Sequence, residues 1–289
     1  MNLLSKIFYP ITGPISFIQN HFKTVLFLTI MYFIVSSSDT KNLETANLQI
    51  IELNGPIVIV DEVLEKIETA KNDINIKGIL LKVNSPGGAV APSIEIAYAI
   101  KELREVKPVV AYASGIMASG SYYASIWANK IIANPGSMVG SIGVIMQSVD
   151  ASELMSKIGI KSQTVKIGKY KESGTPTRQW TKEERDELEK VTQNTYDMFI
   201  TDVANARNLK KENHTSYADA HIFTSSQAKE VGLIDKVATI SVAKNELEKL
   251  SKVENPVWAK ANKMDKFMEK MLSNSISNIS TNLNGLIAY

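Results

Sequence analysis

The chain has 289 residues, 44% of them hydrophobic and 21% charged, so it is long and apolar enough to bury one sizeable core. Its net charge of +2 is spread along the chain without a dense basic block, which argues against a nucleic-acid partner. The absence of cysteine excludes disulfides, thiolate zinc sites and a cysteine nucleophile.

The N-terminal residues indicate a membrane. Residues 24–35 form a dense apolar run, residues 24–38 carry no charge, and residues 7–22 are also apolar. The run is short for a spanning helix, which needs about 20 residues, so we expect an interfacial stretch that leads into one span. Lys6 and Lys23 precede this span and Asp39 follows it, which places the N-terminus in the cytoplasm and the main domain outside. A signal peptide cleaved near Ser36 to Ser38 is the alternative.

The pattern along the chain predicts a membrane-anchoring segment (1–38), a linker (39–47), a main domain (48–252) and a C-terminal segment (253–289) with an amphipathic helix from Met264 to Leu272. Apolar runs and turn residues predict strands over residues 48–53, 57–60, 79–83, 108–113, 130–133, 140–146 and 162–167. Helices are expected from Asp61, after Gly88, from Ser119, and over 154–158, 181–207, 227–230 and 242–250.

Two consecutive strand-turn-helix units stand at the centre of this pattern. The first strand ends in the turn Asn84-Ser85-Pro86-Gly87-Gly88, and the second is followed by Ala118-Ser119-Gly120, which opens a helix. Both turns should lie at the same edge of one parallel sheet, where α/β proteins bind ligands. The domain is therefore expected to be α/β with a mostly parallel sheet.

Ser119 is the candidate nucleophile. A serine before a helix is often only an N-cap, and Ser114 stands in a similar context. Ser119 is preferred because the amides of Gly88 and Gly120, from the two turns, could converge as an oxyanion hole next to it.

The base is harder to find. Of three histidines, His21 precedes the apolar run and His214 is far from the glycine turns, which leaves His221 in a peripheral segment. No Gly-x-Ser-x-Gly elbow, metal-ligand spacing or nucleotide loop is present. A lysine is the remaining base, and Lys171 is one candidate among many. Its pKa would have to fall from about 10.4 to about 7, which burial and neighbouring cations can achieve.

Four ordered motifs carry a family resemblance. They are residues 84–88, residues 118–123, Gly140-Ser141-Ile142-Gly143-Val144 and Gly168-Lys169-Tyr170-Lys171. In this order they resemble the signal peptide peptidase A family, over about residues 54–236. The resemblance implies a ClpP/crotonase-like fold, attachment to the bacterial cytoplasmic membrane, and a Ser-Lys dyad that acts without a cofactor or metal on signal-peptide remnants.

By this resemblance Ser119 is the nucleophile and Lys171 the general base, with Gly88 and Gly120 as oxyanion donors and Gly87 beside the substrate. Family members form ring-shaped homo-oligomers in which the two dyad residues can come from adjacent subunits. The expected function is a membrane-anchored serine endopeptidase whose catalytic domain lies on the extracytoplasmic side. The alternatives are a crotonase-like acyl-CoA hydratase or isomerase and a non-catalytic membrane scaffold.

Two positions depart from the family pattern. Ser121 stands where the family often has a second glycine after the nucleophile, which puts the geometry of that turn in doubt. Asp219-Ala220-His221 lacks the Gly-Arg pair that is common at this place.

Overall fold

The computed structural model describes residues 18–36 and 45–259, which fall into two compact units on either side of the junction between Thr45 and Ala46. The first unit contains helix α2 (Phe22–Ser36). In the two described stretches, every helix is too short or too polar to cross a bilayer. The membrane span therefore stays a prediction, and the expected helix from Met264 to Leu272 lies outside the described residues.

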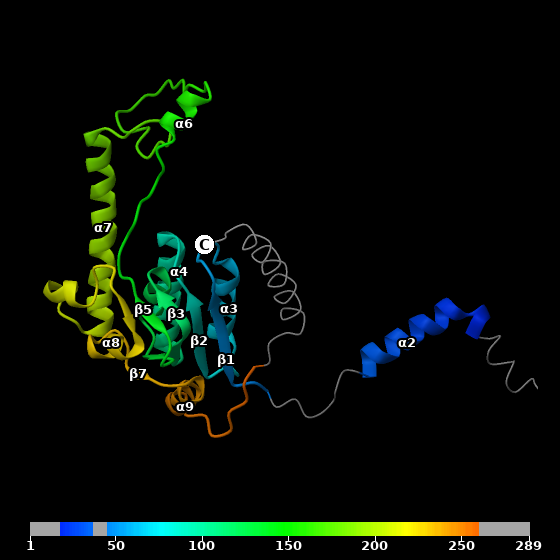
Figure 1. Ribbon diagram of the computed structural model, residues 1–289. Helices are drawn as coiled ribbons and strands as arrows, with labels where there is room; N and C mark the ends of the chain where they lie inside the picture. Colours follow the sequence, from blue (N-terminus) through cyan, green and yellow to red (C-terminus); the bar gives the residue numbers. More distant parts are fainter. Residues whose placement is uncertain (1–17, 37–44, 260–289) are drawn as a thin grey trace, which may run out of the picture. The chain divides into compact units, whose positions relative to one another are not determined.

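The second unit is an α/β domain (Figure 1). Its strands are β1 (Leu48–Asn54), β2 (Gly78–Ser85), β3 (Val109–Ala118), β4 (Lys130–Ala133), β5 (Met138–Gly140), β6 (Ile222–Thr224) and β7 (Lys236–Val237). Its helices are α3 (Asp61–Asn72), α4 (Val90–Val106), α5 (Gly120–Ser125), α6 (Ser152–Lys157), α7 (Lys182–Arg207), the 3-10 helix η1 (Lys211–Ser216), α8 (Ser225–Glu230) and α9 (Ile240–Leu250).

The sheet is mostly parallel, as the sequence predicts. Its main path runs β1-β2-β3-β4-β7, and every neighbouring pair along it is parallel. β5 pairs with β3 in parallel and with β6 in antiparallel. Because β2 and β3 are parallel neighbours, the turns that follow them lie at the same edge of the sheet.

Both faces of the sheet are covered, so its central strands are apolar on both sides. Alternate residues of β2 belong to different cores: Leu81 and Val83 pack with α3, α4 and α5 on one face, and Leu80 packs with Leu247 of α9 on the other. This alternation follows from the two-residue period of a strand and explains why Ile79, Leu80 and Leu81 are apolar in succession. Lys82, by contrast, is only half-buried and pairs with Glu52 of β1.

Four predicted details of the chain are wrong. Residues 57–60 form no strand, because only Ile57 makes a bridge, to Gly88, before α3 begins. The strand expected over 140–146 ends at Gly140, and residues 162–167 form no strand at all. Asp61 does not cap α3, since the N-cap is Val60 without a side-chain hydrogen bond.

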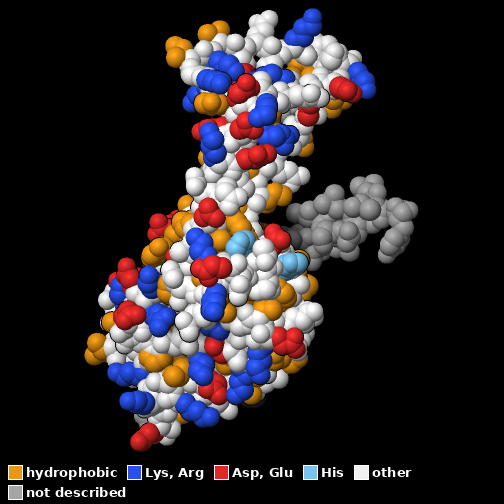
Figure 2. Space-filling model, turned by 90° about the vertical axis from the view of Figure 1, so that its left-hand side faces the viewer, with side chains coloured by type: hydrophobic (Ala, Val, Ile, Leu, Met, Phe, Trp, Pro, Cys, Tyr) orange, Lys and Arg blue, Asp and Glu red, His pale blue; other side chains and the backbone are white. Residues whose placement is uncertain are grey.

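Residues 148–181, which we call the arm, differ from the rest of the domain. They contain the short helix α6 and lie at the N-terminal end of α7, away from the sheet (Figure 1). Their visible surface mixes Lys and Arg with Asp and Glu (Figure 2). α7 itself begins with the predicted capping box, in which Thr181 and Glu184 exchange hydrogen bonds, and its 26 residues span about 39 Å.

Candidate active site

The turns after β2 and β3 meet at one point, where Gly88 and Gly120 face each other. The amide nitrogen of Gly88 lies 3.3 Å from the position that a Cβ would take on Gly120. Gly120 is the first residue of α5, so its N–H has no partner within the helix. The backbone of Gly88 and that of Gly120 therefore lie in close contact between the two turns.

Glycine is required here because the two turns are in close contact. A Cβ on Gly87 would lie 2.6 Å from the Gly120 nitrogen, and one on Gly88 would lie 2.1 Å from the carbonyl oxygen of Ile57. Gly87 also has φ +94°, a conformation that other residues rarely adopt. The structure therefore brings Gly87, Gly88 and Gly120 together at the candidate site.

Ser119 stands between these turns in a strained conformation. Its φ of 53° and ψ of −125° are unusual for a residue with a Cβ, and such strain costs about 1–3 kcal/mol. Its own N–H donates to the Gly140 carbonyl at 2.8 Å, and its carbonyl accepts from Tyr123 at 3.0 Å. The surrounding backbone thus holds Ser119 at a sharp turn from strand to helix.

The alternative serine has a structural role. Ser114 lies where the register between β2 and β3 shifts, and its hydroxyl donates to the Val83 carbonyl at 3.1 Å. The neighbouring Ile116 N–H donates to the Asn84 side chain. Ser114 therefore helps to hold the bulge that carries β3 toward Ser119.

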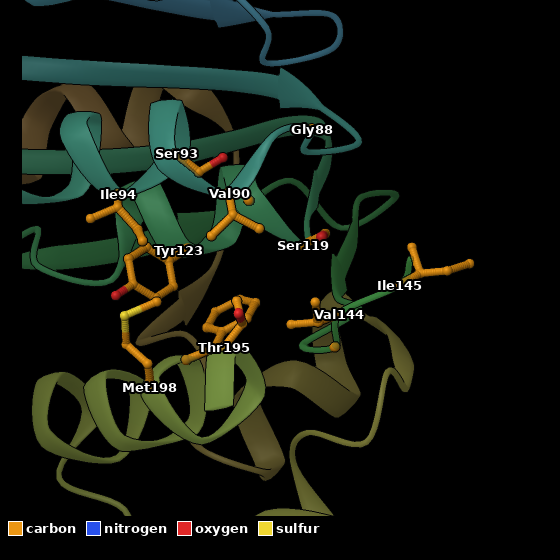
Figure 3. Close-up of a pocket in the computed structure, with 13 residues that line it drawn as sticks. Gly88, Val90, Ser93, Ile94, Ser119, Tyr123, Val144, Ile145, Thr195 and Met198 are labelled. Atoms are coloured by element: carbon orange, nitrogen blue, oxygen red, sulfur yellow. The ribbon is translucent and has the colours of Figure 1, made fainter. Parts of the chain in front are cut away.

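A cavity of about 90 Å³ opens beside Ser119 (Figure 3). Gly88, Ser119 and Gly120 lie at one side of it. The rest of its lining is mostly apolar and includes Val90, Ile94, Tyr123, Val144, Met198 and Phe199. The last two belong to α7. Phe199 stacks edge-on against Tyr123, with ring centroids 4.7 Å apart.

Tyr123 is the one titratable group among the residues that line this cavity. Burial, followed by its hydrogen bond to the Asp202 carboxylate, raises the pKa of Tyr123, so its hydroxyl stays protonated and is no base for Ser119. His221 contributes its backbone carbonyl, which accepts from Ser141 at 2.7 Å, while its ring lies 5.9 Å from that of Phe223. Neither His221 nor His214 lines the cavity.

Lys171 lies elsewhere in the chain, in the arm. Its side chain is exposed, and the adjacent Glu172 accepts from Arg178 at 3.0 Å. Arg178 also binds the buried Glu184 in the first turn of α7, with both nitrogens of its fork at 2.7 and 2.8 Å. Hydrogen bonds from Lys166 and then from Arg178 lower the pKa of Glu172 to about 2, and the hydrogen bond from Arg178 lowers the pKa of Glu184 to about 2. The loop that carries Lys171 is thus fastened to the N-terminal end of α7.

The length of α7 separates Lys171 from Ser119 within one chain. The cavity beside Ser119 is lined by Thr195, eleven residues after Glu184, and eleven residues of helix span about 17 Å. One chain therefore brings together Ser119, Gly87, Gly88 and Gly120 but not Lys171.

A comparison of the chain with models of known protein families identifies its family. The model of peptidase family S49 matches residues 101–254, which is more than half of the chain. The chain belongs to peptidase family S49. This confirms the resemblance to signal peptide peptidase A that the four motifs carry.

Among relatives of this S49 chain, a protein of Methanocaldococcus jannaschii named as a protease is 44% identical over 66% of the chain and 61% of its own length. One of Enterococcus faecium, named as the signal peptide peptidase SppA, is 34% identical over 66% of the chain and 56% of its own length. The chain thus spans somewhat more than half the length of these relatives. A serine-to-alanine mutant of the 1510-N membrane-bound stomatin-specific protease shares the fold, with TM-score 0.51, 16% identity, and coverage of 75% of this chain and 99% of its own.

Proposed function

We propose that the protein is a membrane-anchored serine endopeptidase that cleaves apolar peptides such as signal-peptide remnants. Ser119 is the nucleophile, and Lys171 of a neighbouring copy is the general base. The observation that carries this proposal is that Ser119 lies beside two converging amides and an apolar cavity whose lining contains no basic group. On this proposal one chain supplies the nucleophile and the oxyanion hole, and a second chain supplies the base.

The chemistry follows from these positions. The Ser119 hydroxyl attacks the scissile carbonyl while a neutral lysine amine accepts its proton and then delivers a proton to the leaving amine. The amides of Gly88 and Gly120 donate to the oxyanion that develops on the attacked carbonyl. Water then attacks the acyl ester on Ser119, and the enzyme is regenerated. A neutral lysine near pH 7 requires a pKa about three units below its usual value, or about 4 kcal/mol, which a dry pocket between subunits can supply.

A second copy is the natural source of the base. Lys171 stands at the outer end of α7, where the rest of its own chain leaves it exposed. The arm that carries it also exposes apolar side chains, including Ile167 at 96% and Leu154 at 62% of their surface. A head-to-tail ring of copies would cover these side chains and place each Lys171 in the site of the next subunit.

Backbone without hydrogen-bond partners beside the cavity suits a peptide substrate. Residues 143–147 belong to neither a helix nor a strand, and none of the described residues makes a backbone hydrogen bond to them. A substrate strand could pair with this edge and place its side chain before the cut in the apolar cavity. The apolar residues 24–35, which lie in α2, would hold this site at a membrane on the extracytoplasmic side.

Complementation between two inactive variants tests the proposal. Ser119→Ala and Lys171→Ala are purified separately as full-length protein in detergent and also co-expressed with different affinity tags. Each variant alone is expected to lose cleavage of an apolar fluorogenic peptide. Co-purified mixed assemblies are expected to regain about one quarter of the wild-type activity, because that share of random head-to-tail contacts joins an intact serine to an intact lysine.

Controls decide how a failure is interpreted. His221→Ala should keep wild-type turnover, and a fluorophosphonate should label the wild type but not Ser119→Ala. Mixed assemblies as inactive as their parents, beside an active wild type, would place the base within one chain or on another residue. A wild type that neither cleaves peptides nor reacts with the fluorophosphonate would contradict the peptidase assignment itself.

A further inference from the structure

The side chain of Ser121 connects the two turns that carry the candidate oxyanion amides. It is completely buried, in the second position of α5. Its hydroxyl accepts from the Ala118 N–H at 2.9 Å and lies 2.6 Å from the Ser85 carbonyl, to which it donates. Ala118 is the last residue of β3, and Ser85 is the last residue of β2. One hydroxyl therefore bridges the ends of both central strands.

The bridge continues on the side of Gly88. The hydroxyl of Ser85 accepts from the Gly87 N–H at 3.1 Å, and Ser85 is also completely buried. Ser85 is thus held through its carbonyl by Ser121, and it holds the turn that ends in Gly88. On the other side, Ala118 immediately precedes the strained Ser119. The hydroxyl of Ser121 therefore binds the backbone two residues before Gly120 and three residues before Gly88.

We infer that Ser121 is a positioning residue that sets the spacing between the Gly88 and Gly120 amides, and with it the geometry of the oxyanion hole. This inference depends on the proposed peptidase function. A glycine at position 121, as in the usual family pattern, has no side chain to make the bridge. In this chain the buried hydroxyl of Ser121 thus connects the two turns. With a glycine at this position, the turns would be joined only by backbone packing.

The role predicts an effect on the transition state rather than on substrate binding. The oxyanion exists only during acyl transfer, so misplaced donors lower kcat and leave KM nearly unchanged. Removing an oxyanion donor costs roughly 10²–10³ in kcat, and a displaced donor should cost less. For Ser121→Ala and Ser121→Gly we expect kcat to fall about 10- to 100-fold.

Ser125→Ala is the matched control. Ser125 lies one helical turn further along α5, is equally buried, and donates its hydroxyl to the Ser121 carbonyl at 2.8 Å. Its removal also deletes one buried hydrogen bond, but it touches neither turn. We expect its kcat to stay within about threefold of the wild type, because its hydrogen bond lies away from the reacting carbonyl.

The experiment compares wild type, Ser121→Ala, Ser121→Gly and Ser125→Ala as full-length protein in detergent. For each, kcat and KM are measured with one apolar peptide, together with inhibition by a peptide aldehyde, which forms a tetrahedral adduct on Ser119, and by the product peptide. Both Ser121 variants should bind the aldehyde more weakly by the same factor as their loss in kcat, with unchanged affinity for the product.

Each other result overturns the inference. Ser121 variants whose kcat matches that of Ser125→Ala would show no specific effect on the oxyanion hole. The same holds for Ser121 variants that raise KM and weaken binding of the product peptide by the same factor. Ser121 variants that are unfolded at the assay temperature by circular dichroism would give the hydroxyl a role in folding alone. An inactive, unlabelled wild type would instead contradict the proposed function, so the two failures are distinguishable.

Discussion

The sheet and the arm differ in how far their apolar side chains are buried. In β2, Leu80 and Leu81 are completely buried on opposite faces of the sheet. In the arm, no apolar side chain is fully buried, and Ile167 keeps 96% of its surface exposed. The candidate nucleophile and the candidate amide donors lie at the edge of the sheet, whereas the candidate base lies in the arm. One chain therefore completes one half of the proposed site and presents the other half for use elsewhere.

The largest effect is expected where the site depends on close backbone contact. Gly88→Ala would place a Cβ 2.1 Å from the Ile57 carbonyl oxygen, so the turn must move and its amide must leave the proposed oxyanion hole. We expect peptide cleavage to fall by roughly 10²–10³, the usual cost of a lost oxyanion donor. The measurement is kcat/KM on the full-length protein.

A glycine of the arm provides the contrast. Gly159 has φ +76°, but a Cβ there meets no atom within 4 Å. Gly159→Ala should cost only the strain of a left-handed alanine, about 1–2 kcal/mol of local stability, and should leave kcat/KM within a few-fold of the wild type. Equal losses of activity in the two variants would contradict the distinction between a crowded turn and an open arm.

A second comparison concerns stability. Leu81→Ala removes a fully buried side chain from a central strand and should lower the free energy of unfolding by about 2–5 kcal/mol. Ile167→Ala should leave the unfolding of the single chain unchanged, since its side chain is already exposed to solvent, but should weaken association between copies. Urea denaturation measures the first effect, and sedimentation velocity in detergent measures the second.

Each of the two measurements can by itself contradict the proposal that the arm forms a contact between copies. An Ile167→Ala protein that is destabilised as much as Leu81→Ala, at a concentration where the chain is monomeric, would show that Ile167 is buried within its own subunit. An Ile167→Ala protein that associates like the wild type would show that this side chain lies outside the contact between copies.

The same contrast explains what could be predicted from the sequence. The strand Ile79–Val83 was predictable because it is buried on both faces of the sheet. The capping box at Thr181 was predictable because it is determined by its own residues. The meeting of Gly88 and Ser119 followed from the rule that parallel strands end at one edge. The strand expected over 162–167 was wrong, because its alternating pattern requires a partner strand and none of the residues 18–36 and 45–259 provides one.

The position of the base was less predictable for a related reason. A motif such as Gly168-Lys169-Tyr170-Lys171 specifies which residue types are present, but it does not specify the direction of the helix that follows. The capping box fixes where α7 begins, and its length then carries Lys171 away from Ser119. The role of Ser121 was also hidden, since a buried hydroxyl that bridges two strand ends has no local signature in the sequence.

The smallest expected effect concerns the departure from the family pattern at Ala220. Ala220 has φ +57°, a left-handed conformation in which its Cβ crowds the backbone, and the family commonly has glycine there. Ala220→Gly removes this strain of about 1–2 kcal/mol but adds backbone freedom to the unfolded chain, so a net gain of up to about 1 kcal/mol is expected. In a protein of this size the Tm should rise by about 2 °C.

Ala238→Gly is the control for this change, because Ala238 is outside the set of residues with positive φ. The same loss of a methyl group should there lower the Tm, since only the cost in the unfolded state remains. Parallel thermal denaturation of the two variants measures the difference. Shifts of the same sign would show that the left-handed conformation at Ala220 carries no strain. Shifts of opposite sign would mean that this chain tolerates a strained alanine at position 220. Ala220 lies just before strand β6, which pairs with β5, and its N–H donates to the Ile142 carbonyl.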